Sequence, residues 1–383
     1  MDPVLDMPAP RSLVLRMDIT NTCNLDCIGC SLVDNRKMLG EPAAAMKVEL
    51  FEKIANEVFP YLYEVALSCE AEPILHPQFT RIMKIIEEKT ERNAKLPVRM
   101  TTNATLFTPA KLDAIFDSGL FGVAVSVDGF EPETFSKIRK KGEISKVFEF
   151  MDEVVRRKTA LGRRGMDLPR LQINYTYMKS TLHELLPLIE YSRRWSLENL
   201  VVTHIYSSVG KDMRYELLSD WPEESDRVLI EAEKKCREYG INPHFPALFR
   251  PPVKPEPPKP GLWERLTRGL RPAPNDEVPP NNEMPCEAHS ADGLADLACA
   301  APWRMVKIRW DGSVHPCDLW DASDPLGNLH NQSFEEIWKS PKYTELRSGL
   351  VSGHPTLPQC VYCDRISPDN LEKRKIKSPF THT

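Results

Sequence analysis

The sequence lacks the signatures of several common protein classes. It contains no G-x-x-x-x-G-K-[ST] phosphate loop, no H-E-x-x-H zinc helix and no G-x-S-x-G nucleophile elbow. It has no run of about eighteen apolar residues, and no basic segment followed by an apolar one at its N-terminus. These absences argue against a P-loop enzyme, a zinc protease, an α/β-hydrolase and a secreted or membrane-spanning protein. We expect a cytoplasmic protein with no membrane span.

An excess of positive charge is also missing. The chain has 50 Lys and Arg against 55 Asp and Glu, for a net charge of −5. The densest basic run, residues 156–158 followed by Arg163 and Arg164, falls at a predicted helix end and is typical of a solvated face. Nothing therefore supplies the positive field that nonspecific binding of DNA or RNA requires, and we expect no nucleic-acid partner.

Cysteine is plentiful, with ten in 383 residues. A chain of this length can bury the core of a large α/β enzyme, with room for an appended domain. Because the cytosol keeps thiols reduced, ten cysteines without an export signal favour metal or catalytic thiols over a disulfide framework.

Apolar, β-branched runs alternate with helical patterns over the first 240 residues, which predicts an α/β fold with a parallel sheet. The predicted strands are 12–18, 64–68, 97–102, 121–127, 170–178 and 199–206. The predicted helices are 50–59, 79–91, 109–118, 144–161, 182–195 and 223–239. Six such units curl toward a partial (βα)6 barrel, whose site lies at the carboxyl ends of the strands.

The domain boundaries follow from composition. Residues 1–240 form the predicted barrel, and residues 241–290 are rich in proline, which favours a linker or lid. Residues 291–383 form a smaller C-terminal domain that carries its own cysteines.

Cys23, Cys27 and Cys30 stand at C-x3-C-x2-C spacing directly after the first predicted strand. Thiolates in a tight loop suit iron–sulfur clusters or zinc, and a four-iron cluster held by three cysteines keeps one iron open for another ligand. The alternatives are zinc or unrelated free cysteines, because short motifs also occur by chance.

This spacing resembles the radical S-adenosylmethionine (radical SAM) superfamily. The resemblance implies a [4Fe–4S] cluster whose open iron chelates SAM. It also implies reductive cleavage of SAM to a 5′-deoxyadenosyl radical that abstracts a hydrogen atom from the substrate. An electron donor such as flavodoxin or ferredoxin would reduce the cluster.

Further segments at strand ends resemble the SAM-binding motifs of that superfamily. Residues 70–73, Glu-Ala-Glu-Pro, resemble the G-G-E-P segment, Thr-Thr-Asn at 101–103 resembles the T-N-G element, and Ser-Val-Asp-Gly at 126–129 resembles S-x-D-G. Gly29 stands where an aromatic residue is common, so adenine contact is expected from backbone there. The resemblance implies SAM contacts from Gly29, Ala71, Glu72, Pro73, Asn103, Ser126, Asp128 and Arg139, the last as a carboxylate-binding guanidinium.

Cys299, Cys317, Cys360 and Cys363 supply a complete set of four thiolates for either structural zinc or a [4Fe–4S] cluster. Asp311-Gly312 between two apolar runs predicts a type I′ hairpin that brings the first two thiols together. The pattern resembles the SPASM/Twitch extension of radical SAM enzymes, which favours iron–sulfur. Because no cysteine follows Cys363, the Twitch form with one auxiliary cluster fits better, and the cofactors would be two [4Fe–4S] clusters and SAM.

This arrangement resembles a Twitch alcohol dehydrogenase of aminoglycoside biosynthesis. The resemblance implies oxidation of a small polar molecule, such as a sugar or aminocyclitol, with the auxiliary cluster accepting an electron. Alternatives are a peptide-modifying maturase acting on a short peptide, an epimerase, and a noncatalytic zinc-stabilised binding protein. Candidates for proton or hydrogen transfer are Cys69, Glu70, Tyr175, His204 and His315, each of which could equally be a buried structural residue.

Overall fold

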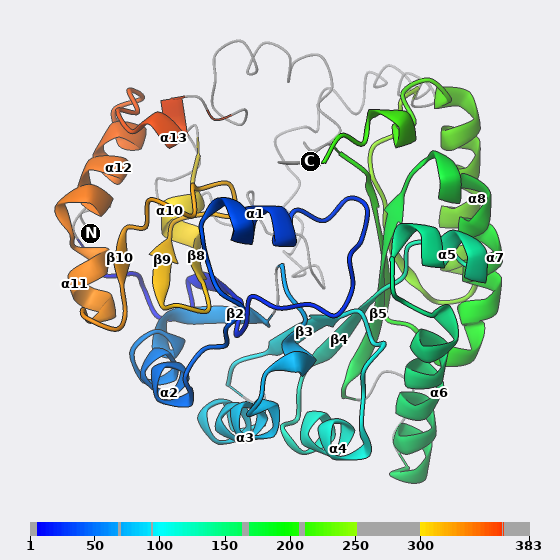
Figure 1. Ribbon diagram of the computed structural model, residues 1–383, viewed down its shortest axis with the longest axis horizontal. Helices are drawn as coiled ribbons and strands as arrows, with labels where there is room; N and C mark the ends of the chain where they lie inside the picture. The colour runs from blue at the N-terminus through cyan, green and yellow to red at the C-terminus, as the bar shows by residue number, and fades with distance from the viewer. Residues whose placement is uncertain are drawn as a thin grey trace, which may run out of the picture.

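The computed structural model describes residues 6–67, 70–92, 95–162, 168–206, 211–250, 299–361 and 363. A curved sheet forms its centre, and most helices lie along the outer side of the curve (Figure 1). The strands are β1 (Leu13–Met17), β2 (Leu62–Leu67), β3 (Val98–Thr102), β4 (Gly122–Ser126), β5 (Arg170–Tyr177), β6 (Asn199–His204), β7 (Asn242–His244), β8 (Met305–Ile308), β9 (Ser313–His315) and β10 (Gly327–Asn328). The predicted α/β class and all six predicted strands are confirmed.

The sheet contains ten strands in the order β10-β9-β8-β1-β2-β3-β4-β5-β6-β7. Strands β1 to β7 are parallel, as the helical crossovers between them require. Strand β7 lies at the edge, where Pro243 can be tolerated because it need not donate to another strand. This short seventh strand lies in the segment predicted as a linker, most of which falls outside the described residues.

The C-terminal hairpin belongs to the same sheet as the barrel. Strand β8 pairs in parallel with β1, with Val14 opposite Met305 and Met17 opposite Ile308. Strand β9 then pairs antiparallel with β8, and β10 with β9. The second group of cysteines therefore rests on the edge of the barrel sheet, an arrangement that the local sequence pattern did not predict.

The predicted type I′ turn is wrong in its type. The Gly312 N–H donates to the Arg309 carbonyl at 2.9 Å, and Gly312 has a φ of +78° while Asp311 is not in the left-handed region. This is the geometry of a turn followed by a glycine bulge. The Asp311 carboxylate accepts from the Ser313 N–H at 3.1 Å and from its hydroxyl at 2.6 Å, which holds Asp311 in place.

The helices lie mostly on the outer face of the sheet, whereas α1 lies on its inner side (Figure 1). They are α1 (Leu32–Met38), α2 (Val48–Glu57), α3 (Phe79–Thr90), α4 (Pro109–Asp117), α5 (Pro132–Ile138), α6 (Ile144–Ala160), α7 (Leu185–Ser192), α8 (Pro222–Glu238), α10 (Ala301–Arg304), α11 (Phe334–Trp338), α12 (Pro341–Val351) and α13 (Pro358–Val361). The six predicted helices correspond to α2, α3, α4, α6, α7 and α8. Among the described residues, no helix has the length and apolar character needed to cross a membrane.

Side chains alternate between the two faces of each strand. In β1, Leu13, Leu15 and Met17 are fully buried and join the core, whereas Val14 and Arg16 are half-buried on the other face. Burying one such apolar side chain contributes roughly 1.5–3 kcal/mol, so this face holds the sheet to its helices. The same alternation in β5 turns Gln172, Asn174 and Thr176 to the half-buried face, which leaves the inside of the curve polar.

Candidate functional site

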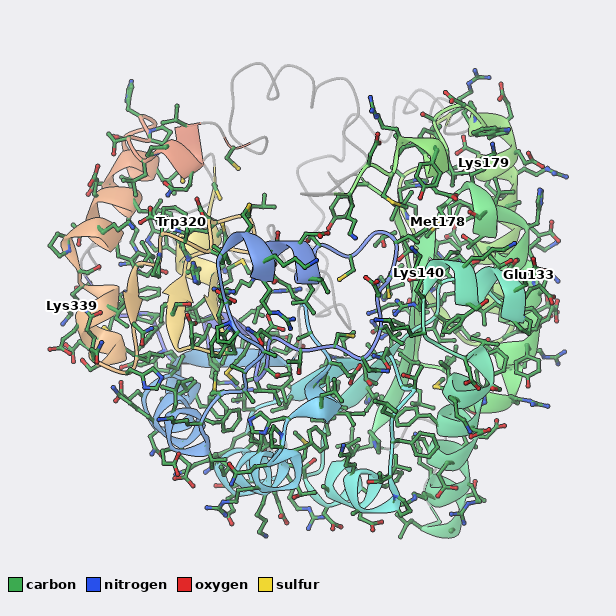
Figure 2. The ribbon with its side chains drawn as sticks, viewed as in Figure 1. Glu133, Lys140, Met178, Lys179, Trp320 and Lys339 are labelled. Carbon is green, nitrogen blue, oxygen red and sulfur yellow. The ribbon has the colours of Figure 1, made fainter. Side chains whose placement is uncertain are left out.

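The loop that carries the first three thiols follows β1 and is pinned by backbone hydrogen bonds. The Asp26 N–H donates to the Lys140 carbonyl at 3.1 Å, and the Ile28 N–H donates to the Ile138 carbonyl at 2.9 Å. Lys140 lies near the middle of the molecule (Figure 2). The end of α5 therefore fixes a loop that has no regular structure of its own.

The three thiols lie in a setting that suits ligand sulfur. Burial raises the pKa of Cys23, and it raises the pKa of Cys27 to about 12. Iron binds the thiolate form of cysteine, so binding of iron would release the protons that these thiols carry. The Cys23 sulfur already accepts from the Leu25 N–H at 3.4 Å and from Asn103 Nδ2 at 3.6 Å. These donors would stabilise a cluster-bound thiolate, so the residues present fit the group.

Glu72 joins the predicted SAM motif to the end of the third strand. Its carboxylate is 2% exposed and accepts from the Ile74 N–H, the Thr102 hydroxyl and the Asn103 N–H at 3.2, 2.8 and 2.7 Å. Pro73 begins the 3-10 turn Pro73–Leu75 that follows. Glu72 and Asn103 are thus in contact, and Asn103 reaches the sulfur of Cys23.

Asp128 and Arg139 form a buried ion pair on the other side of the thiol loop. Arg139 Nη2 lies 2.7 Å from Asp128 Oδ2, with side chains 12% and 8% exposed. The guanidinium lowers the pKa of Cys27 against the larger effect of burial. Within the described part of the chain, Arg139 Nε is buried with no hydrogen-bond partner. Such a group fits the predicted role of binding the SAM carboxylate. Ser126 ends β4 nearby in sequence, on the half-buried face.

The space beside Gly29 is taken by apolar side chains from the region after β6. A Cβ added at Gly29 would stand 3.0 Å from Ile205 Cδ1 and 4.0 Å from Met213 Cε. Ile205 is thus positioned where an aromatic side chain at residue 29 would need room. The sequence showed the glycine but gave no signal for the residues that pack against it.

The four C-terminal thiols gather from separate elements. Cys299 precedes α10, Cys317 follows β9, and Cys360 and Cys363 lie in and just after α13. Burial raises the pKa of Cys317 to about 11 and that of Cys360 to about 12, and the other three thiols raise the pKa of Cys360 further. Across the described residues, no group of three or more His, Cys, Asp or Glu is arranged to hold a single metal ion.

An ion pair ties this second set to the barrel. Arg16 of β1 lies 3.0 Å from Asp318, the residue after Cys317. Trp320, at the C-terminal side of the molecule in Figure 2, is 7% exposed and donates its indole N–H to the Asp324 carbonyl at 2.7 Å. The loop after Cys317 is thus fixed from both sides.

The candidates for proton transfer are scattered. Tyr175 is fully buried and donates its hydroxyl to the Thr181 carbonyl at 2.8 Å, on the helix-facing side of β5. His204 packs between Tyr177 and Phe249, also away from the inside of the curve. Of these candidates, only His315 lies close to the second thiol set, two residues before Cys317 and opposite Lys307 of β8. Cys69 lies outside the described residues.

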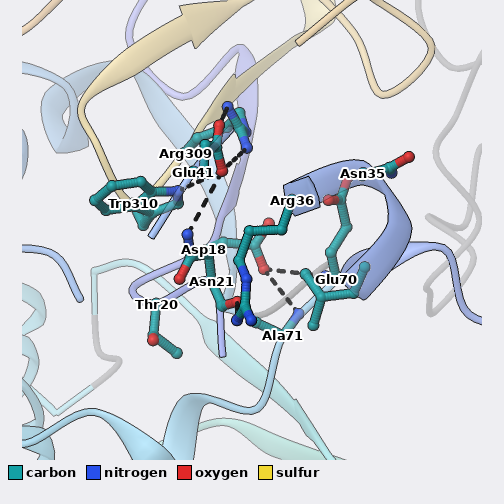
Figure 3. Close-up of a pocket in the computed structure, with 11 residues that line it drawn as sticks. Asp18, Thr20, Asn21, Asn35, Arg36, Glu41, Glu70, Ala71, Arg309 and Trp310 are labelled. Carbon is teal, nitrogen blue, oxygen red and sulfur yellow. Dashed lines mark hydrogen bonds and ion pairs between the residues drawn. The ribbon is translucent and has the colours of Figure 1, made fainter. Parts of the chain in front are cut away.

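Charged residues that join the C-terminal strands to the SAM motif were not predicted, Glu70 excepted. Lys307 of β8 pairs with Glu70, and Asp18 accepts from the Glu70 N–H at 3.0 Å and the Ala71 N–H at 3.4 Å. Arg309 forms a two-point ion pair with Glu41, its Nη1 2.7 Å from Oε1 and its Nη2 2.8 Å from Oε2. These residues line or border a pocket beneath α1 (Figure 3). They are charged residues in loops and strand ends, and nothing in their spacing foretold the pairing.

A network of charged side chains lies at the amino ends of the barrel strands, the end away from the thiol loop. Arg99 contacts Glu64 at 3.4 Å and Glu198 at 3.6 Å, and Arg170 contacts Glu198 at 2.6 Å. Both guanidinium groups stack on the ring of Phe121. These charged side chains thus occupy the amino ends of the strands, whereas the thiol loop lies at the carboxyl ends.

Comparison with known proteins agrees with this geometry. The Radical SAM superfamily model matches residues 17–163, and an iron–sulfur cluster-binding domain model, SPASM, matches residues 299–364. The AdoMet-dependent heme synthase of Methanosarcina barkeri is 23% identical over 339 residues, which cover 87% of this chain and 83% of that protein. A GTP 3′,8-cyclase of Synechocystis is 24% identical over 196 residues, 51% of this chain, and the match spans about half (55%) of that cyclase.

The fold agrees with a solved structure over almost its full length. The crystal structure of Streptococcus suis SuiB bound to its precursor peptide SuiA superposes with a TM-score of 0.64 and 15% identity, covering 97% of this chain and 75% of that one. The radical SAM domain implies SAM and a [4Fe–4S] cluster, and the SPASM domain implies auxiliary cluster binding. The chain therefore contains a radical SAM domain over residues 17–163 and a C-terminal SPASM domain over residues 299–364.

Proposed function

We propose that this radical SAM enzyme oxidises a polar substrate held on the inside of its partial barrel, with a flavodoxin or ferredoxin as electron donor. When bound, SAM and the cluster on Cys23, Cys27 and Cys30 would supply a 5′-deoxyadenosyl radical, and a cluster on the C-terminal thiols would accept an electron. The observation that supports this proposal is the continuous sheet, in which β8 and β9, between Cys299 and Cys317, join β1, the strand that leads into the first thiol loop.

The contacts between the barrel and the C-terminal strands support this function. Strand β8 follows Cys299 closely and pairs in register with β1, which leads into the first thiol loop. Arg16 holds the loop of Cys317 through Asp318. Because close-packed strands resist large relative motion, Cys299 and Cys317 would keep a fixed position relative to the first thiol loop. A substrate held between the two sets could then pass an electron to a cluster on the C-terminal thiols.

The chain's own side chains would bind and orient the reactants. Arg139, held by Asp128, would bind the carboxylate of SAM, and Asn103 would fix Cys23. Inside the curve, Gln172 and Asn174 offer amide groups for a polar substrate; Gln172 Nε2 donates to Asn174 Oδ1 at 2.7 Å. The closed amino end of the barrel would limit access of water to the carboxyl-end mouth.

The relatives give no support to the narrower expectation of a sugar or aminocyclitol. The named relatives are a heme synthase and a GTP cyclase, and the matching structure contains a precursor peptide. A peptide substrate is the second candidate, favoured by the fold shared with SuiB. A mass shift of minus two on a small molecule or on a peptide would separate the two.

A Cys317→Ala variant tests the proposal. We expect it to keep SAM cleavage to 5′-deoxyadenosine within a few-fold of wild type but to lose formation of oxidised product. Cys236→Ala is the matched control, because Cys236 is a buried thiol on α8 that belongs to neither set. Equal product formation by Cys317→Ala and wild type would contradict an electron-accepting role for the C-terminal set.

A further inference from the structure

Three polar side chains beside the first thiol set form a closed ring of hydrogen bonds. The Thr105 hydroxyl donates to Asn103 Oδ1 at 2.7 Å, Asn103 Nδ2 donates to Asn24 Oδ1 at 3.0 Å, and Asn24 Nδ2 donates to Thr105 Oγ1 at 2.9 Å. Each member therefore donates once and accepts once within the ring. Asn24 directly follows Cys23, and Thr105 lies 81 residues after Asn24, so the ring joins the thiol loop to the end of β3.

The ring determines which way the amide of Asn103 faces. Its Oδ1 also accepts from the Thr105 backbone N–H at 3.0 Å, so the amide oxygen is directed toward Thr105 and the amide nitrogen toward the thiol loop. One hydrogen of Nδ2 is donated to Asn24, and the sulfur of Cys23 lies 3.6 Å from the same nitrogen. A flipped amide would present an oxygen to the sulfur, and an oxygen cannot donate. The second hydrogen of Nδ2 is thus held for the sulfur.

The backbone of Asn103 is fixed as well as its side chain. Its N–H donates to the buried carboxylate of Glu72 at 2.7 Å, and the next residue, Ala104, has a left-handed φ of +57°. Asn103 itself is 6% exposed. A donor that is fixed in advance can stabilise a negative charge without first having to reorganise. Asn103 therefore meets the requirements for a donor to a ligand sulfur whose charge changes.

We propose that Asn103 raises the reduction potential of the first cluster by donating to the sulfur of Cys23, and that Asn24 and Thr105 are positioning residues that act through Asn103. The inference rests on the proposed function, because it concerns the cluster that this function assigns to the first thiol set. Reduction by one electron from flavodoxin or ferredoxin adds one negative charge to the cluster and its ligand sulfurs. A hydrogen bond to sulfur stabilises this more negative state, so the cluster is easier to reduce.

A redox titration of the anaerobic holoenzyme, followed by electron paramagnetic resonance, tests this role. The first cluster is identified by the change of its signal when SAM is added, and its potential is measured without SAM. We expect Asn103→Ala to lower the equilibrium constant for reduction about tenfold, a fall of about 59 mV for a one-electron couple. Thr105→Val removes the hydroxyl but keeps the backbone N–H, and should give a smaller fall. Thr105→Ser should restore the wild-type potential.

The control is Thr159→Val, which removes an exposed hydroxyl from α6 and should leave the potential unchanged. The double variant Asn103→Ala/Thr105→Val should have the potential of Asn103→Ala alone, because the hydroxyl acts through Asn103. Asn24→Ala breaks the ring at another member, should also lower the potential, and covers the case in which Thr105→Val does not fold.

Three results would overturn the inference: a wild-type potential in Asn103→Ala or in Thr105→Val, a further fall in the double variant, or an equal fall in Thr159→Val. In each case the wild type still shows a cluster signal that responds to SAM, so the proposed function stands. A wild type without such a signal would overturn the proposed function and this inference together.

Discussion

The two thiol sets are built in opposite ways. Cys23, Cys27 and Cys30 lie within eight residues of one loop, and the groups around them come from the barrel: Asn103, Arg139 and the backbone of α5. The four C-terminal thiols come from residues 299–363 and meet only because a hairpin and short helices fold back on one another. The three thiols of the local loop would leave one iron of a four-iron cluster open, whereas four thiols would ligate every iron. The geometry of the second set also depends on the fold, because its thiols come from distant segments.

The largest expected effect is loss of the first set. Replacing Cys23, Cys27 and Cys30 together with alanine should reduce 5′-deoxyadenosine formation to background, because no other described group offers an open-sided cluster site. The C-terminal set should still bind iron, since its ligands lie on other elements. Liquid chromatography of anaerobic reactions with SAM and a reductant measures the first effect, with Cys236→Ala as control. Residual cleavage above background would contradict the assignment.

The two thiol sets should differ in how much the loss of one ligand lowers the thermal midpoint of the protein. In Cys317→Ala, the thermal midpoint should fall as well as the iron content, because the loop next to Arg16 loses the metal that cross-links distant segments. The same substitution at Cys30 should lower iron content with a smaller fall in midpoint, since its loop is also pinned by backbone bonds to α5. Calorimetric scans of both variants test this, and equal falls would refute the contrast.

Arg139 is the next test. Arg139→Gln leaves Asp128, which also accepts from the Thr176 N–H, without its ion-pair partner at a site about one-tenth exposed. Removing one member of a buried pair costs about 3 kcal/mol or more of the free energy of unfolding. SAM affinity should also fall at least about tenfold, the loss of a charge-assisted contact. Lys140→Gln, an exposed neighbour, is the control for both chemical denaturation and SAM titration. Unchanged SAM affinity would remove Arg139 from the SAM site.

Gly29 should give the smallest effect. In Gly29→Ala the new methyl group would meet Ile205 Cδ1 at 3.0 Å, so the isoleucine has to shift by a few tenths of an ångström. We expect a loss of about 1 kcal/mol in the free energy of unfolding. Combining it with Ile205→Val should recover part of this loss. No recovery in the double variant would show that Ile205 is not the residue in contact.

Local patterns were sufficient for most of the barrel. Strand β3 and helix α3 begin and end within one residue of prediction, because apolar periodicity is set by nearest neighbours along the chain. The pairing of β8 with β1 could not be predicted, since one parallel strand can join any open edge. The turn at Asp311-Gly312 was located correctly but assigned to the wrong type, because the side chain of Asp311 and the residue before it decide the backbone angles.

The site also contains features that local sequence predicts and features that depend on distant segments. The two thiol sets and the residues Glu72, Asn103 and Arg139 were predicted from spacing and resemblance, and Asn103 contacts both Glu72 and Cys23 in the structure. The pairs Arg309–Glu41 and Lys307–Glu70 were not predicted, because they depend on how distant segments meet. Glu70, considered as a base from its place in the motif, is held by Lys307.

The most direct test counts iron and acid-labile sulfide in anaerobically purified wild type, in the Cys23/Cys27/Cys30→Ala variant and in Cys317→Ala. Two [4Fe–4S] clusters predict about eight irons in the wild type and about four in each variant, with SAM cleavage retained only when the first set is intact. Zinc at the C-terminal set would contradict the electron-accepting role. Zinc at both sets, with no cleavage of SAM, would contradict the account as a whole.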